Sequence, residues 1–223
     1  MKSIMYSILL TLVPGMILAQ DDKLYSTTSG ELIFSFANIN NAGDEKGGIM
    51  RFSPVINIQN WLNYDKSEKL GFFTGLSVRN VGFIYDVDET TRIKYRTYNV
   101  GIPVGVKIGN LSDKFLFFGY ELEIPVNYKE KTFIDEDKED KKNIWFTDRV
   151  PTVNHSLMAG IQLPYGATIK FKYYLTNFFD EDFTASDGQG GTYKPYENLD
   201  VNIFYFSLSF GLLKDTRFYY NAE

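Results

Sequence analysis

The stretch YNVGIPVGVKIGN, residues Tyr98–Asn110, alternates large apolar residues with residues that are small or polar. Successive side chains of a β-strand point to opposite faces of the sheet. The pattern therefore predicts a strand with one apolar face and one face of small residues that carries a single charge, Lys107. The fold depends on what each of these two faces contacts.

Seven other segments show the same two-residue period, and no segment beyond residue 19 shows the period of a helix. Many of them are close to the ~9–11 residues that cross a bilayer as a tilted strand. The pattern predicts an all-β fold, an eight-stranded antiparallel up-and-down transmembrane β-barrel with strands over roughly residues 31–213. The eight segments are 32–36, 50–59, 70–79, 98–110, 116–127, 156–163, 168–175 and 204–212.

The connections between these segments alternate between short and long. Short ones are expected at 60–69, 110–113 and 164–166, and longer, more polar ones at 38–48, 85–94, 129–152 and 177–200. Alternation places all the long connections at one end of the barrel. Outer-membrane barrels have this layout, with short periplasmic turns and longer external loops.

The composition of the polar face indicates which face is inside. A water-exposed sheet face would be rich in Lys, Glu, Thr and Gln, but here it is mostly Gly, Ser and Asn with scattered charges. Small residues suit the crowded interior of a closed eight-stranded barrel, and the apolar face carries almost no charge in mid-strand. We therefore expect lipid outside and polar packing inside. A soluble periplasmic barrel with its apolar face inward is the alternative.

The N-terminus predicts export. Lys2 precedes an apolar run that ends at Pro14-Gly15, and Ala19 provides a small residue for cleavage. We expect a signal peptide at residues 1–19 and one outer-membrane barrel domain at 20–223. Without Lys2 the chain has 22 basic and 28 acidic residues, so it lacks the basic footprint of a nucleic-acid partner. It has no cysteine, which excludes disulfides and thiolate metal sites.

Seven charged residues fall on the predicted inward faces. Buried ions are costly unless they are paired. We therefore expect a structural cluster in which at least one carboxylate lies within ~4 Å of a cation, and which blocks the lumen together with Tyr174 and Tyr205. The seven are Arg51, Arg79, Lys107, Glu121, Glu123, Lys170 and Lys172.

Three prolines and five aromatic residues lead to further expectations. Pro54, Pro103 and Pro125 each remove a ladder donor, and β-bulges at Ile102-Pro103 and Ile124-Pro125 would accommodate two of them. The aromatic residues near the predicted strand ends are expected to form the interfacial belt of a membrane barrel. They are Trp61, Tyr64, Tyr95, Tyr98 and Tyr128.

With its signal peptide, its eight alternating segments and the IPVGVK sequence at 102–107, the chain resembles the PorT-like outer-membrane β-barrel domain proteins. The resemblance covers nearly the whole chain beyond residue 19. It implies an integral outer-membrane protein that is assembled by the outer-membrane insertion machinery. It carries no catalytic residue over to this sequence.

Catalytic and cofactor motifs are weak. Some small outer-membrane barrels are lipid A deacylases, whose His and Ser must share one face of a strand. The one histidine, His155, is followed directly by Ser156, so the two point to opposite faces. The acidic residues near Asp180 fit no EF-hand loop, and no phosphate-binding motif is present. We expect no enzymatic activity, no cofactor and no metal.

The sequence thus favours a structural or surface-interaction role through acidic external loops at 129–152 and 177–200. The expected partners are the lipid bilayer, the insertion machinery and an extracellular or membrane protein. The alternative is a small-molecule binder or narrow transporter that uses the lumen, and a lipid-modifying enzyme is a further alternative. A filled, ion-paired lumen would argue against transport, and an open lumen would argue for it.

Overall fold

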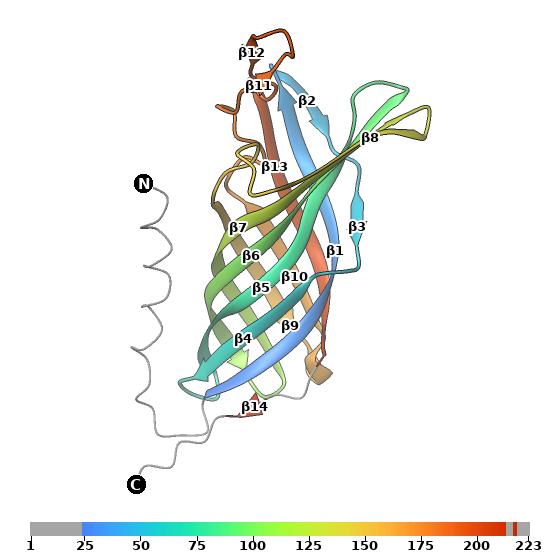
Figure 1. Cartoon of the computed structure of the whole chain (residues 1–223). Helices are drawn as coiled ribbons and strands as arrows, with labels where there is room; N and C mark the ends of the chain where they lie inside the picture. Colours follow the sequence, from blue (N-terminus) through green and yellow to red (C-terminus); the bar gives the residue numbers. More distant parts are fainter. Residues whose placement is uncertain (1–23, 213–215, 218–223) are drawn as a thin grey trace, which may run out of the picture.

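The computed structural model describes residues 24–212 and 216–217, and eight of its strands form a closed ring (Figure 1). Each wall strand is antiparallel to its neighbours in chain order, and the last pairs with the first from Ser29–Gly211 to Asn41–Leu199. The predicted fold class is confirmed. The wall strands are β1 (Leu24–Asn41), β4 (Ile58–Asp65), β5 (Leu70–Asp86), β6 (Thr91–Asn110), β7 (Lys114–Ile134), β9 (Asn154–Gln162), β10 (Thr168–Tyr174) and β13 (Leu199–Gly211).

Shorter elements extend this wall. Two pair with the upper half of β1, one with the upper half of β7, and one with the start of β1. No helix in residues 24–212 is long and apolar enough to cross a bilayer. The elements that pair with the wall are β2 (Asp44–Gly47), β3 (Arg51–Ser53), β8 (Asp137–Trp145) and β14 (Thr216–Arg217). The turn η1 (Pro164–Gly166) and the separate hairpin of β11 (Ala185–Ser186) and β12 (Thr192–Tyr193) do not pair with it.

The two ends of the barrel differ, as the loop lengths predict. Short turns at 66–69, 111–113 and 163–167 share one end with the start of β1 and the end of β13. At the other end the strands continue as hairpins beyond the rim (Figure 1). Much of the segments expected as loops at 85–94 and 129–152 is therefore strand, with turns at 87–90 and 135–136. The expected signal peptide lies outside the described residues.

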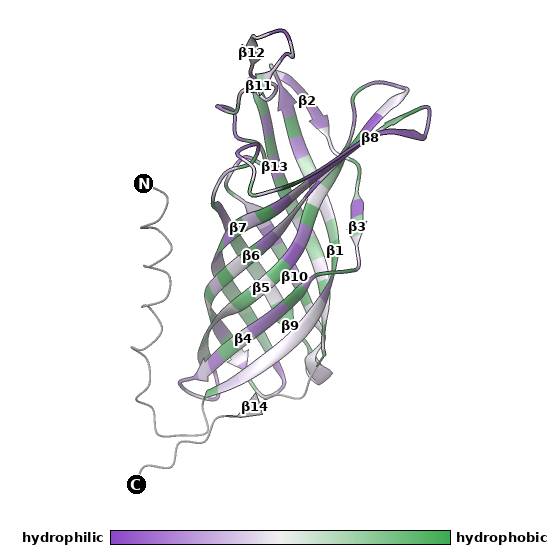
Figure 2. Cartoon of the chain, viewed as in Figure 1, coloured by the Kyte–Doolittle hydropathy of each residue, from purple (hydrophilic) through white to green (hydrophobic). Residues whose placement is uncertain are grey.

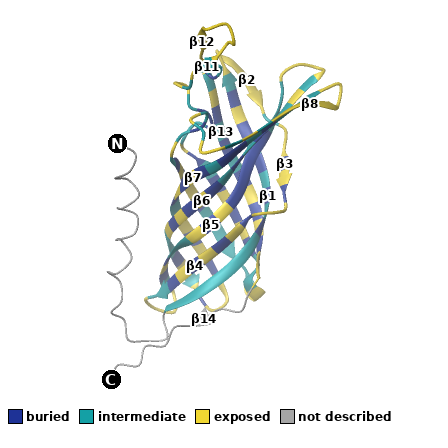
Figure 3. Ribbon diagram, viewed as in Figure 1, coloured by how far each residue is buried: buried dark blue, intermediate teal, exposed yellow. Residues whose placement is uncertain are grey.

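Burial alternates along the wall strands (Figure 3). Within the opening stretch, Lys107 and Pro103 are buried in the barrel, whereas Ile102 and Val104 are exposed on its outside. Hydrophobic and hydrophilic residues alternate along the wall strands (Figure 2), and large apolar side chains of other strands are exposed too. Examples are Leu62, Leu76, Leu122, Leu157, Ile169 and Leu208.

The outer apolar surface is a belt with a sharp upper edge. On β1 and β13 the ring pair Phe36–Phe204 is stacked at 5.4 Å, and the next outward pair is Asn38–Asn202. From Phe204 to Leu212 the belt covers about 27 Å along the strand, or about 21 Å of height at a ~40° tilt. This is most of the ~25 Å apolar band of outer-membrane barrels. The closed barrel with its apolar belt is an integral outer-membrane protein.

The second wall strand lies further along the chain than the sequence pattern predicts. The expected strand at 50–59 is broken at 54–57, and the expected turn at 60–69 holds most of β4. Pro54 lies in the break, where no ladder donor is needed. Residues 51–53 form β3, which pairs with β1 above β4.

The expected proline bulges are half right. Tyr98 pairs with Asn127 and Asn99 with Pro125, so Val126 is the extra residue of a bulge in β7. Pro103 pairs with Glu121 in an unbroken register, so the bulge expected at Ile102-Pro103 is wrong.

The expected aromatic belt is wrong for three of its five residues. Trp61, Tyr95 and Tyr128 are buried in the barrel interior. Exposed aromatic side chains instead occur where β8 returns to the rim, at Trp145 (63% exposed) and Phe146 (74%). Tyr64 and Tyr98 are partly exposed, as a belt position requires.

Candidate functional site

Six charged side chains meet in the middle of the lumen, and none is more than 2% exposed. They come from four wall strands, and each occupies a position of its strand whose side chain points inward. Three cations face three carboxylates, so the cluster is neutral when all six are ionised. The six, called the lumen cluster below, are Glu31 on β1, Arg79 on β5, Glu121 and Glu123 on β7, and Lys170 and Lys172 on β10.

Ion pairs connect the whole lumen cluster. Glu31 accepts from Arg79 Nε at 2.9 Å and from Lys170 Nζ at 2.5 Å. Lys172 Nζ lies 2.6 Å from Glu121 Oε2, well inside the ~4 Å expected for an ion pair. Lys172 also contacts Glu123, and Arg79 Nη1 contacts both Glu121 and Glu123. Each carboxylate therefore has at least two cationic partners.

Neutral side chains complete the hydrogen bonds of the lumen cluster. Gln59 Oε1 accepts from Arg79 Nη2 at 2.9 Å and from Lys170 Nζ at 3.2 Å. Tyr174 donates to Glu123 at 2.6 Å, as does Asn99 at 2.7 Å. A buried charge is costly unless it is paired, and every charged group of the lumen cluster has an oppositely charged partner.

The seven sequence-predicted residues separate into three groups. Five lie in the lumen cluster, but Arg51 lies above it and donates to Asn80 Oδ1 at 2.6 Å. Lys107 lies below it and pairs with Asp65 at 2.7 Å. Sequence reasoning missed Glu31, which precedes the alternating apolar residues of 32–36. Glu31 lies two residues before the inward-pointing Ile33, so its position in β1 also points inward.

The glycines of the opening stretch make room for the lumen contents. A Cβ at Gly101 would lie 2.5 Å from Glu121 Oε1 and 2.6 Å from Ser77 Oγ. A Cβ at Gly105 would lie 2.3 Å from the Phe73 ring. The small face of this strand therefore contacts the charged and aromatic side chains that fill the barrel, and its apolar face contacts lipid.

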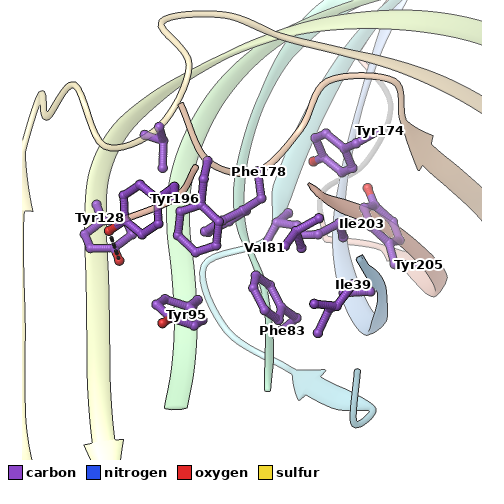
Figure 4. Packing of buried hydrophobic residues seen from close by; sticks show 14 of the residues in the cluster. Ile39, Val81, Phe83, Tyr95, Tyr128, Tyr174, Phe178, Tyr196, Ile203 and Tyr205 are labelled. Atoms are coloured by element: carbon purple, nitrogen blue, oxygen red, sulfur yellow. Dashed lines mark hydrogen bonds between the residues drawn. The ribbon is translucent and has the colours of Figure 1, made fainter. Parts of the chain in front are cut away.

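An aromatic layer covers the lumen cluster on the side of the long hairpins. The segment after β10 turns over the barrel mouth and inserts Phe178 and Phe179 against Phe83 and Tyr95 (Figure 4). Tyr196 stacks on Phe179 with ring centroids 4.2 Å apart. This layer, called the aromatic lid below, closes the mouth with side chains from both the wall and the loop.

Polar contacts attach the aromatic lid to the rim. Arg149 Nη1 donates to Tyr196 Oη at 2.9 Å, and its guanidinium lies 4.5 Å from the centre of the Phe183 ring. The hydroxyl of Tyr128 on β7, which donates to Glu130 at 2.6 Å, lies 3.5 Å from the Tyr196 hydroxyl. Between the lid and the lumen cluster lies a cavity of about 10 Å³, lined in part by Asn99 and Asn154. That volume holds at most about one water molecule.

A second aromatic layer closes the short-turn end. Trp61 stacks on Phe73 with centroids 4.2 Å apart, and Phe117 meets both rings edge-on. Met158 completes this cluster. The lumen is therefore filled at three levels, with the ionic layer between two aromatic layers.

The single histidine lies on the outside of the barrel. His155 is exposed and its Nδ1 contacts the Tyr120 hydroxyl, whereas Ser156 is buried and donates to the backbone oxygen of Glu121 at 3.1 Å. The two side chains are on opposite faces, so they form no proton-transfer pair. Within residues 24–212, no group of three His, Asp or Glu side chains is placed to hold a metal ion.

No protein-family model and no curated protein sequence matches the chain. Among solved structures it is similar to Ail, the attachment invasion locus protein of Yersinia pestis, with 13% identity, TM-score 0.39, and coverage of 88% of this chain and 99% of that one. It is also similar to Neisserial surface protein A (8%, 0.40, 83% and 97%) and to the outer membrane protein OprG from Pseudomonas aeruginosa (10%, 0.35, 89% and 97%). The barrel assignment rests on the hydrogen-bonded ring itself, not on these distant likenesses.

Proposed function

We propose that this protein is a non-enzymatic outer-membrane barrel with a structural or surface-interaction role, of the PorT-like kind that its sequence resembles. The observation that carries the proposal is the filled lumen. The lumen cluster and the two aromatic layers occupy the path that a transporter would need, and the cavity between the lid and the cluster is about 10 Å³. This argues against the alternative of a lumenal binder or narrow transporter.

The surface for such a role is the loop at 177–200, which holds six acidic residues and one basic residue. Asp182 and Lys194 form an exposed ion pair within it, 2.8 Å apart. The other loop expected to be acidic, 129–152, holds seven acidic and six basic residues. The acidic interaction surface is therefore concentrated in the segment that also forms the aromatic lid.

Single-channel recording in planar bilayers tests the proposal against transport. The wild-type barrel should give no steady conductance above the bare bilayer. Replacing the lid residues Phe178 and Phe179 by Ala should still give none, because the lumen cluster remains below them. Stable wild-type conductance, or conductance that appears on lid removal alone, would favour the transporter.

A further inference from the structure

The ends of β5–β8 above the apolar belt, called the hairpin arms below, carry six basic residues on their outward face in addition to Arg92. Above the apolar belt, β6, β7 and β8 continue as one antiparallel sheet, and the alternation places acidic Glu130 on its inner face. The six, called the basic face below, are Lys94, Arg96, Lys129, Lys131, Lys138 and Lys141.

The basic face is contiguous across the three strands. Arg96 pairs directly with Lys129, and Lys131 lies between Lys94 on one side and Lys141 on the other. Opposed side chains in an antiparallel sheet have Cβ atoms only ~5 Å apart, so like charges there destabilise the sheet. An external anion bound between these side chains would relieve the repulsion.

No carboxylate of the described residues lies within 4.0 Å of these six cations, although other cations of the same arms are paired. Arg92 lies 2.6 Å from Asp86, and Lys142 lies 2.7 Å from Glu130. Burial and the neighbouring cations Arg96 and Lys141 lower the pKa of Lys131, which lies above the belt. The six positive charges of the basic face therefore lie close together, and no carboxylate of the described residues neutralises them.

The position of the basic face indicates what compensates it. On β6, the outward residues that lead away from the belt are Val100, then Tyr98, then Arg96. Arg96 therefore lies about 13 Å along the strand from Val100, the last aliphatic residue of the belt on this strand. Arg96 and Lys129 both lie over the Tyr98 ring, at 5.8 and 4.7 Å from its centre. Tyr and Trp side chains are typical of the membrane–water interface, and Trp145 is exposed on neighbouring β8. The long basic side chains therefore begin at the level of the lipid head groups.

We propose that the basic face binds the phosphate or carboxylate head groups of anionic lipids in the external leaflet around the barrel. Continuity with the lipid-facing belt favours membrane lipid over a soluble anion. The opposite wall provides a contrast, because the corresponding outward positions on β1 and β13 are Asn38, Asn40, Asp200 and Asn202. Binding would therefore be confined to one side of the barrel and would order the arms against the membrane surface.

Native mass spectrometry of the purified barrel in non-ionic detergent tests this proposal with added phosphatidylglycerol or phosphatidylcholine. The variant K94Q/K129Q/K131Q removes three charges from the basic face. Its matched control, K66Q/K69Q/K114Q, removes three exposed charges at the short-turn end. Each cation near a charged membrane surface changes binding about fivefold, so the first variant should lose phosphatidylglycerol affinity about 100-fold. The control should change it less than about twofold.

Three outcomes would overturn the proposal. These are equal losses in both variants, no preference of the wild type for phosphatidylglycerol, and displacement of the lipid by millimolar inorganic phosphate, which would indicate a soluble ligand. As a second readout, the pKa of Lys131, measured by NMR after reductive ¹³C-methylation, should rise when phosphatidylglycerol is added. The lipid assay does not depend on lumen conductance, so failure of this proposal is distinguishable from failure of the proposed function.

Discussion

Glu121→Gln is the substitution that tests the lumen cluster most sharply. It keeps the shape of the side chain but removes one of three negative charges that balance three buried cations. The Gln amide nitrogen would face one of two cations, either Lys172 Nζ, which now lies 2.6 Å from Glu121 Oε2, or Arg79 Nη1. Arg79 would also lose a charged partner. The substitution therefore leaves a buried positive charge without full compensation.

The expected cost follows from the burial of this charge. Removing one partner from a buried ion pair typically costs about 3–5 kcal/mol, and Glu121, Arg79 and Lys172 are all fully buried. We expect Glu121→Gln to lower the free energy of unfolding by about this amount. Insertion into the membrane should persist, since the lipid-facing belt is unchanged.

Equilibrium unfolding in urea with the barrel in lipid vesicles measures this effect. Trp61, stacked on Phe73 in the lower aromatic layer, reports on the lumen by its fluorescence. Heat-modifiable gel migration reports separately whether the barrel has closed.

Two further variants make the result interpretable. Glu121→Gln with Lys172→Met restores neutrality among the remaining four charges and should recover at least half of the lost stability. Asp86→Asn removes a carboxylate of an exposed ion pair and should leave the urea midpoint unchanged within error. If Glu121→Gln costs no more than Asp86→Asn, the lumen cluster does not hold the barrel together.

Three other predictions concern packing, topology and pH. Gly101→Ala should lower the free energy of unfolding by about 1–3 kcal/mol, because the new Cβ overpacks against Glu121. The control Gly211→Ala, with nothing within 4 Å of its new Cβ, should not change the urea midpoint. Equal effects of the two substitutions would contradict this packing. A cysteine at Glu136 should react with an impermeant maleimide on intact cells and one at Ser112 only after permeabilisation, and the reverse pattern would invert the topology. Hydrogen bonds from Arg92 lower the pKa of Asp86. The stabilisation of the fold by this pair is therefore present at neutral pH and is lost as the pH falls through the lowered pKa of Asp86. An NMR titration should show a midpoint for Asp86 below the ~3.9 of free aspartate, and Arg92→Gln should raise it; the same midpoint in both proteins would show that the pair is not formed in solution.

The strand count and the faces of the strands could be predicted from the sequence because β-structure has a period of two. Lys107 and Glu121 lie two residues from Gly105 and Gly119 and share their inward parity, and the burial of both charges follows directly from it. The same parity places Tyr95 inside, since it is an odd position of β6 like Lys107. The sequence thus contained the signal that Tyr95 is not an interfacial residue.

Other features depend on backbone irregularities that the alternation does not encode. The bulge at Val126 changes the parity of β7, so Tyr128 and Glu130 point inward although they are even positions. A one-residue slip moves every following side chain to the other face. The extension of the strands above the belt could not be predicted either. The outward residues there are polar, so the sequence lacks the apolar alternation of a strand and predicts a loop. The basic face was hidden in this way within a segment of mixed charge.

Single-cysteine scanning of Tyr98–Asn110 by electron paramagnetic resonance tests the central claim most directly, and the absence of native cysteine leaves no background label. Spin labels at Val100, Ile102 and Val104 should be accessible to oxygen, which partitions into lipid, and not to a water-soluble nickel chelate. Labels at Asn99, Pro103 and Lys107 should be protected from both reagents, because these side chains are buried in a filled lumen. Nickel accessibility at the second set would indicate an open pore, and nickel accessibility at the first set would show that the apolar face is not in a membrane.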